Sequence, residues 1–277
     1  MNRTAVRDLL ATFELEPAGP GCFRATNMPS PHGVVFGGQL MGQALLAGRA
    51  GHDHMQVKTL HVVFARGAAP DSPLDIDVDP IHAGRTFASS TVTIRQGERI
   101  CVGAQVLLTA DEPDLIRHSE PPPPCSPPDS ASDDDPETWQ IRVVGDVDLT
   151  DPNAVGPAEL DVWTRFVGAP ENQAVHQALL AFASDGFLIG TAMRPHAGVG
   201  QAQAHKTLST GVISHTITFH EPIEAGGWLL LSHRSGYAGR GRSYGSANVF
   251  SGSGQLVASF VQDAMVRPRD PQGGSKL

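Results

Sequence analysis

Two polar residues, Asp185 and Gln262, interrupt apolar patterns in the second half of the chain. Asp185 follows the segment 169–184, in which apolar residues recur at helical spacing and Pro170 suits the first turn of a helix. Apolar neighbours and the negative end of the helix dipole both disfavour a charged carboxylate, so we expect a raised pKa. Such a group can act as a general base toward a water molecule. The alternative is that residues 184–186 simply form the turn that ends the helix.

Gln262 lies in the last predicted strand, residues 256–266. Side chains alternate between the two faces of a strand. The row that contains Gln262 is otherwise apolar and comprises Leu256, Ala258, Phe260, Ala264 and Val266. A buried amide without partners costs about 1–3 kcal/mol. This side chain therefore either bonds to neighbouring backbone, for example at a bulge, or holds a ligand.

An internal repeat indicates how these residues are positioned. The sequence QALLA occurs at 43–47 and again at 177–181, an offset of 134 residues. Strand-like segments share an offset of 155, as in AGR at 83–85 and 238–240. Two similar units in one chain are expected to pair about a pseudo-two-fold axis, as identical subunits do in a dimer.

The repeat also makes the two polar residues asymmetric. At these offsets Asp185 corresponds to Gly51, and Gln262 corresponds to Leu107. Both polar residues therefore belong to the second copy alone. This is the pattern expected of one active site in a duplicated fold.

The elements that must carry these residues are an α+β arrangement in each copy. A glycine-containing helical segment, 34–50, precedes strand-like segments at 57–66, 74–82, 87–95 and 100–109. We expect a sheet wrapped on a helix. Residues 111–158 are rich in Pro and Asp and indicate an exposed linker, in which 141–149 adds a strand or lies along the surface. The predicted domains are therefore 1–110 and 159–277, joined by the linker 111–158.

Four segments resemble the type II acyl-CoA thioesterases, which are double-hotdog proteins. The segments are VFGGQLMGQALLA, HQALLAFASDGFLIGTAMRPH, SHTITFHEPI and LVASFVQDAMVR. The resemblance implies a double-hotdog fold and the hydrolysis of acyl-CoA thioesters to a free fatty acid and coenzyme A. It implies no cofactor, since coenzyme A is part of the substrate, and it implies a homo-oligomer.

The resemblance also implies a set of catalytic residues. In that family an Asp, a Thr and a Gln hold the water that attacks the thioester. The Asp position falls on Asp185, the Gln position on Gln262 and the Thr position on Val212, which has no hydroxyl group. Strict alternation places Ser214 and Thr210 on the same face as Val212, so either could supply a hydroxyl about 6.6 Å along the strand. Otherwise Asp185 and Gln262 hold the water alone.

The substrate suggests further binding residues. A backbone N–H near Gly37 and Gly38, at a helix start, is a candidate to polarise the thioester carbonyl. Coenzyme A is anionic and the chain has a net charge of −9, so a locally basic surface is required. The candidates are Arg85, Arg240 and Arg242, unless these are simply solvated turn residues. The apolar acyl tunnel is expected around Phe36, Leu40, Phe182 and Phe187.

Two other functions compete with thioester hydrolysis. Val212 favours an acyl-CoA-binding protein with little or no turnover. Residues 77–82, DVDPIH, are similar to the Asp-to-His signature of hotdog enoyl-CoA hydratases. That signature belongs on the central helix, however, and this segment reads as a strand followed by a turn.

Composition excludes several classes of protein. The acidic charge disfavours nucleic-acid binding. Three widely separated cysteines predict no disulfide framework and a cytoplasmic protein. No apolar run reaches about 18 residues, so no membrane span is expected. The twelve histidines lack tetrahedral spacing, so no metal site is expected, and no G-x-S-x-G motif indicates a nucleophilic serine.

Overall fold

The computed structural model describes residues 5–30, 32–128, 137–145 and 147–269. Residues 129–136 and 146 of the predicted linker lie outside the described residues. The same holds for residues 1–4 and 31 of the first predicted domain, and for 270–277 of the second.

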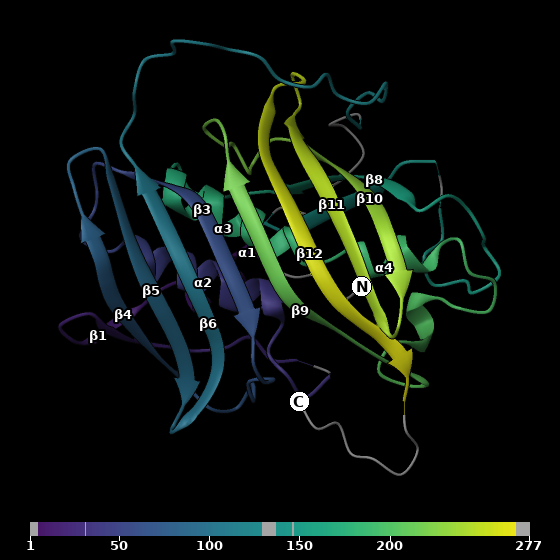
Figure 1. The fold of residues 1–277 in the computed structure, drawn as a ribbon, viewed down its shortest axis with the longest axis horizontal. Helices are drawn as coiled ribbons and strands as arrows, with labels where there is room; N and C mark the ends of the chain where they lie inside the picture. Colours follow the sequence, from purple (N-terminus) through teal and green to yellow (C-terminus); the bar gives the residue numbers. More distant parts are fainter. Residues whose placement is uncertain (1–4, 31, 129–136, 146, 270–277) are drawn as a thin grey trace.

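One antiparallel sheet of twelve strands forms the front layer in Figure 1, and the helices lie behind it. Its strand order is β1-β2-β4-β5-β6-β3-β9-β12-β11-β10-β8-β7. The first six strands are β1 (Glu16–Gly19), β2 (Cys22–Ala25), β3 (Gln56–Phe64), β4 (Leu74–Ala83), β5 (Phe87–Gln96) and β6 (Arg99–Thr109). The last six are β7 (Trp139–Val143), β8 (Glu159–Phe166), β9 (Leu208–Phe219), β10 (Leu229–Gly239), β11 (Arg242–Ser251) and β12 (Leu256–Pro268).

The helices are α1 (Val6–Thr12), α2 (Gly37–Arg49), α3 (Gln173–Ser184) and α4 (Leu188–Met193). The sequence placed Pro170 in the first turn of α3, and that detail is wrong. The helix begins at Gln173 because Asn172 acts as its N-cap, with a side chain that accepts hydrogen bonds from the amides of Ala174 and Val175. Asp185 is the C-cap residue of this helix.

Helices α2 and α3 run antiparallel and approach closely through glycines. A Cβ added at Gly38 would collide with the backbone of Phe182, and one added at Gly42 would lie 3.3 Å from the carbonyl oxygen of Ala178. Gly38 thus allows the two helix backbones to approach closely, whereas the nearest atoms at Gly42 belong to the ring of Phe13. The approach brings the N-terminus of α2 beside the C-terminus of α3.

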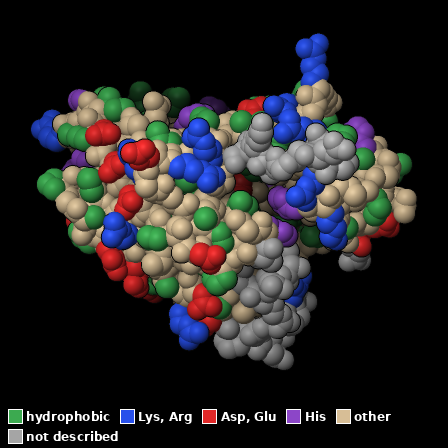
Figure 2. All heavy atoms as spheres, turned by 90° about the horizontal axis from the view of Figure 1, so that it is seen from below, with side chains coloured by type: hydrophobic (Ala, Val, Ile, Leu, Met, Phe, Trp, Pro, Cys, Tyr) green, Lys and Arg blue, Asp and Glu red, His purple; other side chains and the backbone are tan. Residues whose placement is uncertain are grey.

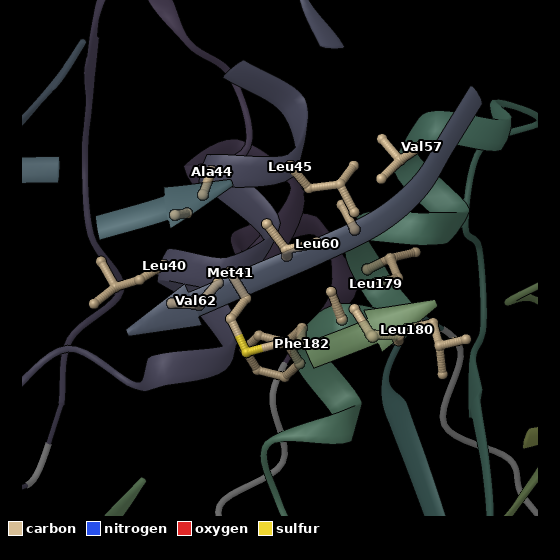
Figure 3. Packing of buried hydrophobic residues seen from close by; sticks show 14 of the residues in the cluster. Leu40, Met41, Ala44, Leu45, Val57, Leu60, Val62, Leu179, Leu180 and Phe182 are labelled. Carbon is tan, nitrogen blue, oxygen red and sulfur yellow. The ribbon is translucent and has the colours of Figure 1, made fainter. Parts of the chain in front are cut away.

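The core extends through both halves of the molecule. Strand β3 lies across both helices, and its Leu60 and Val62 are buried with Met41 of α2 and Leu180 of α3 (Figure 3). These side chains belong to one buried cluster that also includes Phe260 of β12. The two halves therefore share their packing.

The strands confirm the internal repeat, with one correction. Strands β4 and β10 begin 155 residues apart (229 − 74), as do β5 and β11 (242 − 87). In the first half Ser90 pairs with Val106, and its counterpart Gly245 pairs with Gln262. The offset in the last strand is therefore 156 (262 − 106). The first-half counterpart of Gln262 is Val106 rather than the predicted Leu107.

A longer turn causes this shift. In the first half Gln96 pairs with Arg99, which leaves two residues in the β5–β6 turn. In the second half the amide of Ser251 donates to the carbonyl of Gln255, which leaves three. The extra residue lies in the turn, so each residue of β12 faces the same way as its counterpart in β6.

Strands β3 and β9 join the two halves at the centre of the sheet. His61 pairs with Thr216. Two residues away in each direction, Thr59 pairs with Thr218 and Val63 pairs with Ser214. His61 and Thr216 are themselves counterparts at the offset of 155. The pseudo-two-fold axis therefore passes between them, where His61 Nδ1 lies 2.7 Å from Thr216 Oγ1.

The predicted linker contributes an edge strand. Strand β7 pairs with β8, and Trp139 donates a hydrogen bond of 2.7 Å from its indole to the hydroxyl of Thr164. Part of the Pro- and Asp-rich stretch is thus built into the sheet.

Candidate active site

Asp185 is a buried carboxylate at the junction of α2 and α3. Its Oδ2 accepts a hydrogen bond of 3.0 Å from the amide of Gly38, in the first turn of α2. Its Oδ1 is buried and has no hydrogen-bond partner among the described residues. Burial raises the pKa of Asp185 to about 7, although the Gly38 hydrogen bond opposes the shift. The predicted rise in pKa is confirmed, with burial as its cause.

Gln262 points inward from β12 and is 1% exposed. Its Oε1 lies 3.2 Å from Nδ1 of His215, the residue opposite it on β9. Its Nε2 is buried and has no hydrogen-bond partner within the described parts of the chain. The amide therefore has one end held by His215 and the other end unpaired.

His215 connects Gln262 to the end of helix α3. Its Nε2 lies 3.0 Å from the hydroxyl of Ser184, the residue that precedes Asp185. The Ser184 hydroxyl also lies 2.8 Å from the carbonyl oxygen of Ala181. A continuous set of polar contacts thus joins α3, β9 and β12 inside an otherwise apolar core.

The sequence did not reveal that His215 contacts both Ser184 and Gln262. The alternation of His215 with Ile213 and Ile217 indicated that it points inward, and the burial of His215 confirms this. That pattern suggested an ordinary core histidine. It could not show which residues the ring contacts, because the neighbours of a buried ring depend on tertiary packing. The signal that was available is position: Ser184 directly precedes Asp185.

Ser214 lies on the opposite face of β9 from Gln262. A β-bulge leaves Ile213 unpaired, so that Ser214 pairs with Asp263 while Val212 pairs with Ala264. The Ser214 hydroxyl donates a hydrogen bond of 3.1 Å to Asp263 at an exposed position. The expectation that Val212 and Ser214 share one face is therefore wrong. Paired residues share a face, so Val212 points inward with Ala264.

Thr210 lies on the inward face and is 8% exposed. It pairs with Val266, two positions further from Gln262 than the pair of Val212 and Ala264. The bulge thus keeps one of the two alternative hydroxyls on the side of the candidate site.

The two helix-start glycines adjoin Asp185. The amide of Gly38 is already bonded to its carboxylate. A Cβ added at Gly37 would lie 2.8 Å from Asp185 Oδ2. A side chain at Gly37 would therefore crowd the carboxylate, whereas one at Gly38 would collide with the backbone of Phe182.

The three candidate arginines do not lie together. Arg240 and Arg242 are exposed at the β10–β11 turn. Arg242 pairs with Met265 of β12, which lies three positions beyond Gln262. Arg85 lies at the β4–β5 turn, beside the Phe87–Thr109 pair, which is at the opposite end of the strands. The structure therefore brings only Arg240 and Arg242 to the end of the sheet nearer to Gln262.

The expected tunnel residues are mostly buried against one another. Phe182 has its ring 5.0 Å from the ring of Phe36 and 5.1 Å from that of Trp139. Leu40 and Phe187 are also buried, whereas Phe36 is 36% exposed. Phe36, Leu40 and Phe182 lie where α2 and α3 meet, whereas Phe187 packs in a separate cluster with Leu160 and Val162.

The hydratase-like segment is part of a strand, as expected. Residues 77–82 lie in β4, and Asp77 forms an ion pair of 2.9 Å with Arg95. This strand lies in the first half of the sheet order, away from β9 and β12.

Three remaining expectations concern metals, cysteines and membranes. Within the described residues, no group of three or more His, Cys, Asp or Glu side chains could hold a metal ion. Cys22, Cys101 and Cys125 are all free. Among the helices of the described residues, none is both long enough and apolar enough to cross a membrane.

Comparison with known protein families gives the chain its place. The family model described as the acyl-CoA thioesterase C-terminal domain matches residues 119–266, and the one described as the N-terminal domain matches residues 25–109. This chain belongs to the acyl-CoA thioesterase family. The two matches include every polar residue of the candidate site.

Individual relatives of this acyl-CoA thioesterase extend over its whole length. It is 26% identical to acyl-coenzyme A thioesterase 8 of Mus musculus, over 98% of this chain and 93% of the relative. The solved tesB protein of Mycobacterium avium subsp. paratuberculosis is 25% identical, with a TM-score of 0.80, and the match covers 95% of this chain and 100% of that chain. A protein with a hot dog fold from Alicyclobacillus acidocaldarius is 19% identical, with a TM-score of 0.76, over 95% and 99% of the two chains. The fold of this thioesterase is therefore a hotdog-type α+β fold.

Proposed function

We propose that this thioesterase hydrolyses acyl-CoA thioesters with a water molecule held between Asp185 and Gln262. One observation carries this proposal. Asp185 Oδ1 is a buried acceptor without a partner, and Gln262 Nε2 is a buried donor without a partner, among the described residues. His215 connects Gln262 to Ser184, the residue that precedes Asp185 in the chain. A water needs such polar groups on two sides before it is stable in an apolar interior.

The chemistry follows from the types of these groups. The water donates a hydrogen bond to Asp185 Oδ1 and accepts a hydrogen bond from Gln262 Nε2. A pKa of about 7 makes the carboxylate a base matched to neutral pH. The water oxygen forms a bond to the thioester carbonyl carbon, and Asp185 takes the proton. The carbon–sulfur bond then breaks, and Asp185 returns the proton to the sulfur of coenzyme A.

The developing oxyanion requires a hydrogen-bond donor. The amide of Gly38 is bonded to Asp185, so we assign this role to the amide of Gly37, the first residue of α2. Backbone amides at a helix start carry partial positive charge and suit an anion.

The phosphates of coenzyme A require cations outside the buried site. Arg242 is exposed about 10 Å along the strands from Gln262, given a rise of about 3.3 Å per residue, and Arg240 is exposed in the adjoining turn. Figure 2 views the molecule from below and shows Lys, Arg and His side chains around a hollow under the C-terminal half. We propose Arg240 and Arg242 for the phosphates. Arg85 provides a distant control.

A free-thiol assay on a panel of acyl-CoAs tests the proposal. Replacement of Asp185 by Asn or of Gln262 by Ala is expected to lower kcat at least about 100-fold, because each removes a group that holds the water. Asp263→Asn is the matched control, since this neighbouring carboxylate is exposed on the other face. Unchanged hydrolysis in both Asp185→Asn and Gln262→Ala would contradict the mechanism.

Val212 supports a second candidate, an acyl-CoA-binding protein with little turnover. The inward position beside Ala264 holds an apolar side chain instead of a hydroxyl. A binder raises the melting temperature in the presence of acyl-CoA but releases no thiol. The Val212→Thr variant in the same assay distinguishes the two, since an added hydroxyl that raises kcat identifies a hydrolytic site.

Other features belong to the same proposal. We infer a double hotdog with units at 1–110 and 159–277, in which α2 and α3 are the central helices and residues 111–158 form the connection. A homo-oligomer and a cytoplasmic location are likewise proposed. Three free cysteines are consistent with a reducing compartment.

A further inference from the structure

The polar contacts behind Gln262 suggest a role for His215 that goes beyond packing. We propose that His215 and Ser184 fix the orientation of the Gln262 amide, so that its NH2 group faces the water and Asp185. His215 is then a positioning residue, which acts on the reaction through Gln262. This inference rests on the proposed function, because it concerns the same water site.

The imidazole of His215 is held rigidly. It is 1% exposed and stacks on Phe260, with the ring centroids 5.2 Å apart. Burial lowers the pKa of His215 to about 4, so the ring is neutral at neutral pH. A neutral imidazole has one N–H donor and one bare acceptor nitrogen. Its two neighbours therefore receive opposite roles.

The positions of the neighbours decide which nitrogen carries the proton. Gln262 Oε1, 3.2 Å from Nδ1, can only accept, so Nδ1 carries the proton and donates to it. Nε2 then accepts from the Ser184 hydroxyl at 3.0 Å, and this bond replaces the 2.8 Å bond of that hydroxyl to the carbonyl of Ala181. Gln262 Nε2 then points away from His215 as a free donor. The opposite tautomer would turn the amide and direct its oxygen toward the site, where the Asp185 carboxylate already supplies an acceptor. Only the first arrangement gives the water one donor and one acceptor.

The first half of the chain shows that the fold does not need these polar groups. The counterparts of Ser184, His215 and Gln262 are Ala50, Leu60 and Val106, at offsets of 134, 155 and 156. Leu60 and Val106 are buried and pair with each other, as His215 and Gln262 do. Apolar side chains therefore fill the places of His215 and Gln262 in the first half, whereas Ala50 is exposed. The polar set occurs only in the half that contains Asp185, which indicates a role in the reaction.

Substitutions at His215 test the proposal in the full-length protein. His215→Leu, which copies the first half, is expected to fold and to lower kcat about tenfold, the equivalent of one orienting hydrogen bond, without a change in KM. His215→Asn places an amide near the position of Nδ1 and is expected to recover most of this loss. Ser184→Ala is expected to lower kcat less than His215→Leu.

His233 supplies a matched control. It is 2% exposed, packs against Phe260, and has its pKa lowered by burial to about 4, but it bonds to the carbonyl of Leu160 instead of Gln262. His233→Asn is expected to leave kcat within about twofold of the parent protein. An equal loss of kcat in His233→Asn and His215→Leu would mean that core packing alone is responsible.

A double substitution separates this inference from the proposed function. In a Gln262→Ala background, His215→Leu is expected to cause no further loss of kcat, because its effect passes through the amide. A full additional tenfold loss would overturn the inference, and so would wild-type kcat in His215→Leu alone. Failure of the proposed function is a different result, in which Asp185→Asn and Gln262→Ala themselves retain activity.

Discussion

Asp185 combines two properties at the scale of a single residue. It is buried, and only one of its oxygens has a partner in the described residues. Burial therefore raises its pKa to about 7 while the Gly38 amide supplies one compensating bond. A carboxylate placed in this way is useful as a base but costs folding free energy when it is charged.

This cost gives a measurable dependence of stability on pH. The pKa of Asp185 is about 7 in the folded state, against an ordinary value of 3.8. The folded state therefore binds the extra proton between these values, and the contribution of Asp185 to stability falls as pH rises from about 4 to about 7. Asp185→Asn is expected to be more stable than the parent protein at pH 8, by on the order of 2–4 kcal/mol.

Denaturant unfolding at pH 4 and pH 8 checks this expectation. The stability difference between Asp185→Asn and the parent protein is expected to shrink toward zero at pH 4, where Asp185 is protonated. Asp263→Asn, at an exposed position, is expected to show little change at either pH. A variant that is destabilised at pH 8 would show that the charged form of Asp185 stabilises the fold.

At the scale of elements, the antiparallel contact of α2 with α3 sets the position of Asp185. Gly38 contributes both a close backbone approach and the amide that binds the carboxylate. Helix propensity alone would favour Ala over Gly by about 1 kcal/mol. The contact with the Phe182 backbone opposes this, since a main-chain neighbour cannot rotate away.

Gly38→Ala is therefore expected to destabilise the protein by about 1–3 kcal/mol, against the propensity scale. It is also expected to lower kcat, because separation of the helices removes the Gly38–Asp185 bond. Thermal unfolding and the thiol assay measure both effects. Gly103→Ala is the control, since a Cβ there meets no atom within 4 Å. A stabilised, fully active Gly38→Ala variant would contradict this account of the helix contact.

The sequence predicted most of the elements but not their local irregularities. Periodicity placed α2, α3, the four strands β3 to β6 and the last strand β12, and the repeat implied the strands between α3 and β12. It missed the bulge at Ile213, which reverses the face of Ser214, since a bulge depends on the partner strand. It also missed the Asn172 cap, whose side chain accepts hydrogen bonds from the first turn and starts the helix at Gln173, after Pro170.

The candidate site was predictable to a similar extent. Asp185 and Gln262 were found because each breaks an apolar pattern and has no polar counterpart in the first copy. The relay through His215 and Ser184 could not be read from spacing, because it joins residues from three separate elements. Arg85 was grouped with Arg240 by the repeat, but the two-fold relation sends counterpart turns to opposite ends of the sheet.

At the scale of the whole molecule, the sheet and the core are continuous between the halves. The β3–β9 pairing joins them in the sheet, and one cluster of buried side chains extends through both. A fragment of residues 1–110 would leave the edge of β3 unpaired and the α3-facing side of α2 uncovered. Exposed edges and apolar faces promote association.

We therefore expect the fragment 1–110 to dimerise or aggregate when it is produced alone. Light scattering coupled to size-exclusion chromatography measures the molar mass of the fragment. The full chain, in which both halves are present, is the reference. A monomeric fragment that unfolds in one sharp transition would show that the first half is stable without its partner.

The contact on the pseudo-two-fold axis has a consequence for the ancestry of the chain. Where two identical chains meet on a true axis, the residue at the centre must face its own copy, so both side chains are the same. Here the centre is occupied by His61 and Thr216, an imidazole beside a hydroxyl. Covalent fusion of the two copies removed the requirement for identity at this seam, and the same freedom allowed one copy to become polar while the other stayed apolar.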